Sequence, residues 1–454
     1  FVLPRQGILD KSSYIKFQVL GATGNHRLPL TAGCLAMIET ATLFCGGVQV
    51  AQTRGVGQLL NLKQFYRTPH DRNNKQAQRV GCFAGQMYDG TTTGGSNLPG
   101  HIGINTHEVW ATGGGPAAIT NARQISTGFK LTNVLDTTPE WRLYVEELFP
   151  ILYNNNLPLG LIDDEFSIVL DLSPDEAKGQ RAVIDGGGAW TTGTNVVAPS
   201  LHVDLVFYDD PINQQTTMDK LRDVLNKGEK IVFTDSQYVL QNQPATTAAG
   251  GIQSINTLLG LDFQVVRNIL VATPYIVDYA AAGVNSGDPI LGQYFSVGSP
   301  NYNTTTGKGG NTLQITINSQ PVYPNPIDSD NKIWDQLSQV MPTPFKINLA
   351  QSSFVGQTDA AGAVVAAQNR FTNKTLFGKA QDSLCGKGHY YGLNLSRTYA
   401  NVLGAGTSVG RQPVLLELTD NRAATDFGAK LVHIWAECER VLMVQNGRVL
   451  VSGS

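Results

Sequence analysis

The stretch ATLFCGGVQV, residues Ala41–Val50, predicts a β-hairpin, because two apolar runs flank a Gly46-Gly47 pair that suits a tight turn. In the other half of the chain, LQITINSQPV, residues Leu313–Val322, repeats the same plan around Asn318-Ser319. Repetition of one structural unit constrains a whole fold more than any single motif does. We therefore interpret the two stretches as matching parts of a duplicated all-β unit.

The segments that follow the two hairpins support a duplication. A helical pattern comes after each hairpin, at Gln58–Arg67 in the first half and at Asn331–Val340 in the second. Each half later supplies two long apolar strands. These are predicted at Phe166–Leu172 and His202–Tyr208, and then at Pro413–Leu418 and Lys430–Val444.

Length and composition agree with two all-β domains. The chain has 454 residues, 41% of them hydrophobic and only 15% charged, and it contains 48 glycines. Two domains of about 200–250 residues suit such a length. We place the first domain at residues 1–210, a linking helix at 211–229 and the second domain at 230–454. Three tracts, Gly81–Lys130, Gly283–Asn311 and Ser352–Gly388, are expected to be long surface loops.

Other local patterns predict individual elements. Ser13–Leu20 alternates between apolar and polar residues, as a half-buried strand does. Asn446-Gly447 between β-branched residues predicts a terminal hairpin with a type I′ turn. Further short helices are expected at Glu146–Asn154 and at Thr217–Lys227, the latter ending at Gly228.

Net charge, cysteine content and the lengths of apolar runs indicate which partners and which compartment to expect. The net charge is −3, so global electrostatics gives no reason to expect binding to nucleic acid. The five cysteines are odd in number and scattered, which suits a reducing compartment, and Cys45 and Cys438 are expected to be small hydrophobes inside strands. Neither a signal peptide nor an apolar run of about 18 residues is recognisable.

One string has the form of a catalytic motif. Gly406–Gly410 reads G-x-S-x-G, and Asp420, Asp426 and His433 follow Ser408 in the order of an α/β-hydrolase triad. That motif needs a strand before the serine and a helix after it, whereas a strand is predicted after Ser408. We therefore interpret the string as a loop of small residues.

Other candidates for chemistry are weaker. Cys385 and His389 lack a second pair of ligands for zinc, and His101 and His107 lie in a loop-like tract. Asp163–Glu165 is typical of a solvated turn rather than of one half of a glycosidase pair. The runs Gly113–Gly115 and Gly186–Gly188 lack the features of a phosphate-binding loop. The sequence thus predicts no catalytic residue, no cofactor-binding residue, no metal ligand and no cofactor.

Taken together, the chain resembles the double jelly-roll major capsid proteins of polinton-like viruses and virophages, and more distantly those of nucleocytoplasmic large DNA viruses. The likeness covers most of the chain as a pattern rather than as one diagnostic string. The segments that carry it are Leu9–Tyr14, Leu28–Leu30, the Gly46-Gly47 hairpin, Phe149–Leu161, Phe166–Leu172, Val203–Asp209 with the helix after it, and Trp435–Val451.

This resemblance implies two tandem eight-stranded antiparallel jelly rolls with a few short helices and long loops. It also implies a structural, non-enzymatic protein of the virion, assembled inside the host cell as pseudo-hexameric homotrimers that tile the icosahedral capsid of a double-stranded DNA virus. Its partners would be copies of itself, penton and minor or cement capsid proteins, and as a further candidate an internal membrane. No sequence-specific binding to nucleic acid is expected.

Two other classes remain as alternatives. A polysaccharide hydrolase on a β-sandwich would need paired carboxylates that converge on a cleft, and the carboxylates of this chain are scattered. A viral or cellular attachment protein that binds carbohydrate through a β-sandwich would favour aromatic loop tips and a domain without duplication. The internal repeat favours the capsid protein over both.

Overall fold

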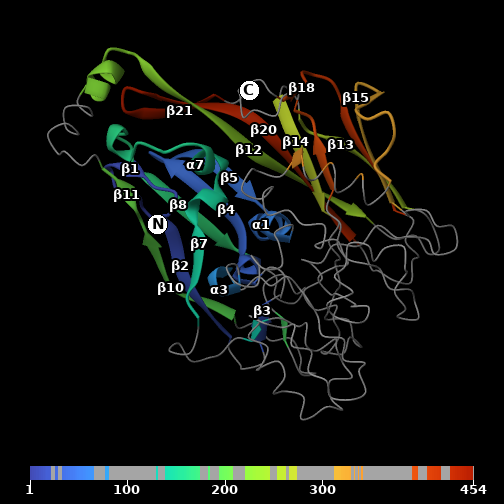
Figure 1. Cartoon of the computed structure of the whole chain (residues 1–454), viewed down its shortest axis with the longest axis horizontal. Coiled ribbons are helices and arrows are strands. Elements are labelled where there is room, and N and C mark those ends of the chain that lie inside the picture. Colours follow the sequence, from blue (N-terminus) through green and yellow to red (C-terminus); the bar gives the residue numbers. More distant parts are fainter. Residues whose placement is uncertain are drawn as a thin grey trace, which may run out of the picture.

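The structure, a computed structural model, describes residues 1–21, 26–28, 33–65, 77–80, 129–130, 139–173, 183–184, 194–207, 220–245, 253–261, 265–272, 311–328, 332, 336, 339–340, 391–396, 406–420 and 430–452. Strands dominate these residues, and all the named strand pairs are antiparallel, which confirms the predicted all-β class. Figure 1 shows two groups of strands, one formed mainly by the N-terminal half and one by the C-terminal half. Among the described residues, no helix is long and apolar enough to span a membrane.

The first group of strands forms a β-sandwich around one core. One sheet has the order β5-β4-β8 and the other β10-β2-β7. Their strands are β2 (Tyr14–Gly21), β4 (Ile38–Cys45), β5 (Val48–Arg54), β7 (Trp141–Tyr144), β8 (Phe166–Leu172) and β10 (Thr194–His202). Alternation along β2 buries Ile15, Phe17 and Val19, as the sequence predicted, and these side chains join Leu43 and Ile168 of the other sheet in one core.

Short elements complete the first sandwich. Two-residue and three-residue strands form the two-stranded sheet β1-β11 and the three-stranded sheet β6-β3-β9. These are β1 (Ile8–Leu9), β3 (His26–Leu28), β6 (Phe129–Lys130), β9 (Val183–Ile184) and β11 (Leu205–Val206). The helices are η1 (Gly33–Met37), α1 (Val56–Phe65), α3 (Ala77–Val80), α6 (Val145–Leu148), α7 (Pro150–Asn154) and η5 (Leu159–Leu161).

The second sandwich pairs a larger sheet with a four-stranded one. The larger sheet has the order β12-β20-β14-β17, with β18 added beside β14 and β21 beside β20, and the other has the order β13-β19-β15-β16. The strands are β12 (Lys230–Ala245), β13 (Gln253–Leu259), β14 (Val265–Ala272), β15 (Asn311–Ile317), β16 (Gln320–Pro321), β17 (Tyr391–Asn394), β18 (Thr407–Ser408), β19 (Val414–Asp420), β20 (Lys430–Gln445) and β21 (Arg448–Ser452). Its core joins Ile269 and Ile434 to Ile315 and Leu416 of the facing sheet.

One ladder connects the two sandwiches. Strands β12 and β20 are 16 residues long and pair over their whole length. Leu442 and Val444 at one end of β20 belong to the first core, whereas Val432 and Ile434 at the other end belong to the second. Figure 1 shows the two strands running side by side past both groups of strands. The ladder is therefore a structural part of both sandwiches.

The predicted turns are confirmed by their backbone angles. Gly46 and Gly47 have φ of +56° and +81°, and Asn318 and Ser319 have φ of +51° and +62°. Asn446 and Gly447, at the terminal hairpin, have φ of +50° and +72°, as a type I′ turn requires.

The predicted helices are partly confirmed. Gln58–Arg67 corresponds to α1, which begins two residues earlier than predicted, and Glu146–Asn154 is split into α6 and α7 at Phe149, before Pro150. Residues 220–226 are helical, and Gly228 follows with φ of +91°. Residues 332, 336, 339 and 340 of the predicted Asn331–Val340 helix are helical, and its other residues lie outside the described part of the chain.

The predicted strand His202–Tyr208 is wrong in its position. Strand β10 ends at His202, and only the two residues of β11 follow. The reason is that the backbone groups of Asp204 form hydrogen bonds with residues of a turn and not with a neighbouring strand. The Asp204 carbonyl accepts from the Asp10 backbone N–H, and the Asp204 N–H donates to the Ser13 hydroxyl. The three predicted long loops lie almost wholly outside the described residues, and the domain boundary at 211–229 remains a prediction.

Helix α1 packs so closely against η1 that one of its positions has no room for a side chain. A Cβ atom added at Gly57 would lie 2.5 Å from the Leu35 carbonyl oxygen and 3.1 Å from that of Ile38. Because these neighbours are backbone atoms, they cannot move aside as the end of a side chain can. Glycine at position 57 therefore sets how deeply α1 enters the molecule.

Replacing Gly57 by alanine tests this packing. Helix propensity alone would make Gly57→Ala stabilising by about 1 kcal/mol. We expect the opposite sign, a loss of roughly 1–3 kcal/mol, because overpacking dominates. The matched control is Gly260→Ala, since Gly260 has no heavy atom within 4 Å of the added Cβ. Urea unfolding midpoints of both variants would measure the difference, and equal midpoints would contradict the packing argument.

Candidate functional site

A belt of polar side chains crosses the β12–β20 ladder between the two cores. Along β20, the apolar residues of the second core give way to Glu437, Glu439 and Arg440, and the apolar residues of the first core follow. We call this belt the seam network and define it as Lys63, Asp235, Arg267, Glu437, Glu439 and Arg440. All but Glu437 are buried, although charged residues are rarely found inside proteins unless they are paired.

Arg440 joins the ladder to the first sandwich. Its guanidinium forms a buried ion pair with Asp235, the residue directly opposite it on β12. The same group donates to the Val50 carbonyl oxygen on β5 and, at 2.9 Å, to Oε1 of Gln237. Burial raises the pKa of Asp235 to about 6, although the charge of Arg440 acts to lower it. Arg440 thus fixes β12 and β20 relative to β5, a strand of the first sandwich.

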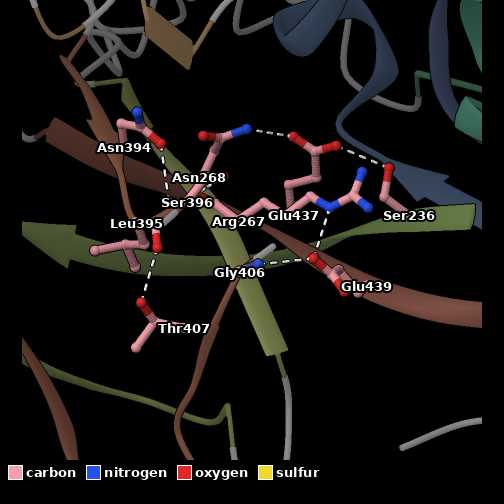
Figure 2. Close-up of polar contacts among 10 residues, drawn as sticks. All are labelled: Ser236, Arg267, Asn268, Asn394, Leu395, Ser396, Gly406, Thr407, Glu437 and Glu439. Carbon is pink, nitrogen blue, oxygen red and sulfur yellow. Dashed lines mark hydrogen bonds and ion pairs between the residues drawn. The ribbon is translucent and has the colours of Figure 1, made fainter. Parts of the chain in front are cut away.

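Two glutamates of β20 organise the second half of the seam network (Figure 2). Glu439 Oε1 accepts from Arg267 Nε at 2.9 Å and from the Gly406 backbone N–H at 2.8 Å. Glu437 accepts from the Ser236 hydroxyl at 2.8 Å and from Asn268 Nδ2 at 2.7 Å. Each carboxylate therefore holds a neighbouring strand in register with β20 through charge-assisted hydrogen bonds.

Helix α1 supplies the remaining contacts across the seam. The Lys63 ammonium lies 4.6 Å from the centre of the Tyr238 ring on β12. Burial lowers the pKa of Lys63 to about 8, and the charges of Glu437 and Glu147 oppose this shift. Trp435 on β20 donates its indole N–H to the Arg54 carbonyl oxygen just before α1. Leu59 and Leu62 of α1 pack in the second core, whereas Val56 and Leu60 pack in the first.

This arrangement is suited to holding two domains together and not to turnover. All of its charged groups except Glu437 are buried, and four of them form two ion pairs, so a substrate would have to displace structural contacts to reach them. Sequence reasoning did not single these residues out. The available signal was the presence of three charged residues close together within the otherwise apolar strand Lys430–Val444.

The structure separates the residues of the hydrolase-like string. Ser408 pairs with Val265 at one end of β14, and His433 pairs with Ala272 at the other end and on the opposite edge. Seven residues of strand correspond to roughly 20 Å, so Ser408 and His433 cannot share a proton. Asp420 ends β19 in the facing sheet, and Asp426 lies outside the described residues.

His433 is instead a buried core residue. One of its ring nitrogens, Nδ1, lies 2.6 Å from Oδ1 of Asn242, the residue opposite it on β12. The ring also contacts Trp435, with 5.4 Å between ring centres. Burial lowers the pKa of His433 to about 3, so the neutral imidazole is the folded form.

The acidic run Asp163–Glu165 is a turn, as the sequence predicted. Asp163 and Glu165 are exposed, and the run lies beside two hairpin tips. The Asp163 N–H donates to the Gly447 carbonyl oxygen at 2.8 Å, and the Gly46 N–H donates to the Glu165 carbonyl oxygen at 3.0 Å. The turn therefore anchors the ends of two hairpins.

The other sequence candidates fall outside the described part of the chain. These are His101, His107, Cys385, His389 and the glycine runs at 113–115 and 186–188. Within the residues that the structure describes, no group of three or more His, Cys, Asp or Glu side chains is placed to hold a metal ion. Cys45 and Cys438 are buried in strands, as predicted, and burial raises the pKa of each thiol to about 12.

Comparison with solved structures assigns the fold. The chain is similar to PBCV-1 VP54 fitted into a reconstruction of the virophage Sputnik, with a TM-score of 0.53 and 11% identity over 100% of this chain and 92% of that one. The Sputnik virophage structure gives a TM-score of 0.53 and the PBCV-1 virus capsid 0.51, each at 11% identity over 100% of this chain and over 84% and 92% of theirs. These proteins are double jelly-roll major capsid proteins.

The chain therefore has the double jelly-roll fold, and the resemblance read from the sequence is confirmed at the level of fold. No protein-family model matches the sequence. No curated protein matches it either.

The seam network predicts that removing a buried ion pair lowers the free energy of unfolding much more than removing an exposed one. Glu439→Ala would remove the carboxylate that forms the 2.9 Å ion pair with the buried Arg267 guanidinium, and we expect a loss of about 3–5 kcal/mol in the free energy of unfolding. The control is Asp328→Ala, which removes an exposed pair of 2.7 Å with Lys332 and should change stability by less than about 1 kcal/mol. Urea unfolding would compare them, and similar losses would show that the seam network is not a stabilising unit.

His433 predicts a pH dependence of stability. Its folded pKa of about 3 lies below the ordinary value of 6.5, so the stability it contributes is present above pH 6.5 and is lost as pH falls toward 3. The full loss is on the order of 5 kcal/mol. We expect His433→Gln to flatten this part of the curve, whereas His202→Gln, at an exposed position, should leave it unchanged. Unfolding midpoints measured between pH 7 and 3.5 test this, and an unchanged slope in His433→Gln would refute it.

Proposed function

We propose that this chain is the major structural protein of an icosahedral viral capsid and that it forms homotrimeric, pseudo-hexameric capsomers. The observation that supports this most is the double jelly-roll fold, which matches solved capsid proteins over the whole of this chain and 92% of PBCV-1 VP54. Because the match covers both rolls, the similarity extends to the complete two-roll architecture and is not limited to one sandwich.

The rigid connection between the rolls supports the same function. A shell subunit has to keep its two rolls at one fixed angle, because every copy meets its neighbours through the same surfaces. The β12–β20 ladder and the seam network supply that rigidity, since strands and charged contacts of one sandwich engage the other directly. Three such chains would present six rolls in a ring, which is the geometry of a pseudo-hexamer.

The remaining features of this proposal follow from a shell function. The host virus would have a double-stranded DNA genome, and the protein would be located in the virion. Its partners would be further copies, penton proteins and minor or cement capsid proteins, with an internal membrane as a further candidate. The shell function requires no active site, cofactor or sequence-specific contact with nucleic acid.

Assembly of the purified chain tests the proposal. We expect a homotrimer of about 147 kDa, three times the chain mass of 48.9 kDa. The trimer should persist at high salt, because salt screens exposed ion pairs but does not weaken the burial of apolar surface. Multi-angle light scattering at low and high ionic strength would give the mass, and negative-stain images should show six-sided outlines. A monomer at both ionic strengths would contradict the proposal.

A further inference from the structure

The outer face of the β12–β20–β21 sheet carries a row of apolar side chains. Val232 on β12 lies opposite Met443 on β20, and Met443 lies opposite Leu450 on β21. Val232 is 50% exposed and Leu450 is 46% exposed. Directly opposite residues in an antiparallel sheet lie on the same face, so the three side chains form one continuous row. We call it the apolar row.

The other face of the same sheet is already buried. Phe233, Leu442, Val444 and Val451 point into or pack against the first core. An antiparallel sheet with one buried face usually presents polar residues on its other face. At the apolar row both faces of the sheet are apolar, so the row is an exposed apolar surface of the kind that marks a contact site.

The charged residues beside the apolar row indicate which kind of surface could pack against it. The next row of the same face, one step toward the terminal turn, consists of Lys230, Gln445 and Arg448. Lys230 and Arg448 are exposed. A fitting surface would therefore combine apolar side chains with a carboxylate at its rim.

The apolar row continues an interface that exists within the chain. Side chains two residues apart on a strand lie on one face, which places Tyr238 on the same face of β12 as Val232. Tyr238 is covered by Lys63 of α1, a first-sandwich helix. On this face of β12, Tyr238 thus lies at the contact between two rolls, whereas Val232 is half exposed.

A second surface of the chain has the complementary chemistry. Leu258 on β13 is 61% exposed and lies opposite Leu415 on β19, on the outer face of the second sandwich. Glu417 lies two residues along β19 on that face, opposite Asn256. This surface therefore presents two leucines, which could pack on the apolar row, next to one carboxylate, which could pair with the cationic residues beside that row.

We propose that the apolar row, flanked by Lys230 and Arg448, docks on the Leu258–Leu415–Glu417 surface of a second copy of this chain. The inference rests on the proposed capsomer and names the contact that closes it. Two different surfaces that meet head to tail produce a ring if the rotation closes. In such a ring the seam network joins rolls within a chain, and the apolar row joins rolls between chains.

Single substitutions at exposed positions test the contact without disturbing the fold. Leu450→Glu places a charge in the apolar row and should raise the concentration at which half of the trimer dissociates by roughly tenfold or more. The matched control is Val169→Glu on β8, at a residue 42% exposed but outside both surfaces. Light scattering over a dilution series measures dissociation, and far-ultraviolet circular dichroism spectra equal to that of the unmodified chain confirm that both variants fold, since unfolding midpoints also depend on association.

A charge exchange then tests the named partner surface. Arg448→Glu and Glu417→Arg should each weaken the trimer, and the double variant should regain at least part of the lost affinity. If both single variants form a weaker trimer and the double variant regains none of the lost affinity, the pairing of these two surfaces is overturned. Trimers unaffected by Leu450→Glu would overturn the contact altogether while leaving the capsomer intact. An unmodified chain that is monomeric would instead refute the proposed function.

A membrane is the other occupant that the experiment distinguishes. Sedimentation with vesicles of phosphatidylcholine and phosphatidylglycerol would be measured for the unmodified chain and for Leu450→Glu. Vesicle binding that Leu450→Glu abolishes, together with an unchanged trimer, would assign the apolar row to a lipid surface and overturn the contact between copies.

Discussion

The structure depends on one constraint, which is that a single antiparallel ladder serves two hydrophobic cores. Strands β12 and β20 pair over 16 residues, whereas strands of about 3–10 residues are usual within a single sheet. Their two ends are buried in different cores, so neither sandwich can complete its packing while the ladder is displaced. The two rolls are therefore held at one relative position, because displacing the ladder would disturb both cores.

The charged groups at the middle of the ladder add specificity to this connection. A buried ion pair contributes little net stability when compared with apolar residues of the same size, but a partner left unpaired is costly. Arg440 reaches Asp235 and the Val50 carbonyl oxygen only when the ladder is correctly placed on β5. Any shift of register would leave these charges unsatisfied. The seam network thus penalises wrong arrangements of the two rolls.

In the proposed capsomer, this division of roles would let one chain be rigid inside and associate through its outer face. The seam network that joins the two rolls within the chain consists of charged and mostly buried side chains, whereas the apolar row on the outer face of the β12–β20–β21 sheet is exposed. Internal contacts need to specify one register, and the low-dielectric interior makes mispaired charges expensive. Contacts between copies need to bury surface without a fixed covalent connection, and apolar area provides that driving force.

The sequence by itself determined the elements whose signal is local. The Gly46-Gly47, Asn318-Ser319 and Asn446-Gly447 turns, the alternation of β2 and the bounds of β8 depend on neighbouring residues alone, and the structure confirms them. Contacts between distant segments were decided only by tertiary structure. Glu439 meets Arg267 and Gly406 because three strands far apart in the chain converge, and His433 lies about 20 Å from Ser408 because strand order, and not spacing in sequence, sets that distance.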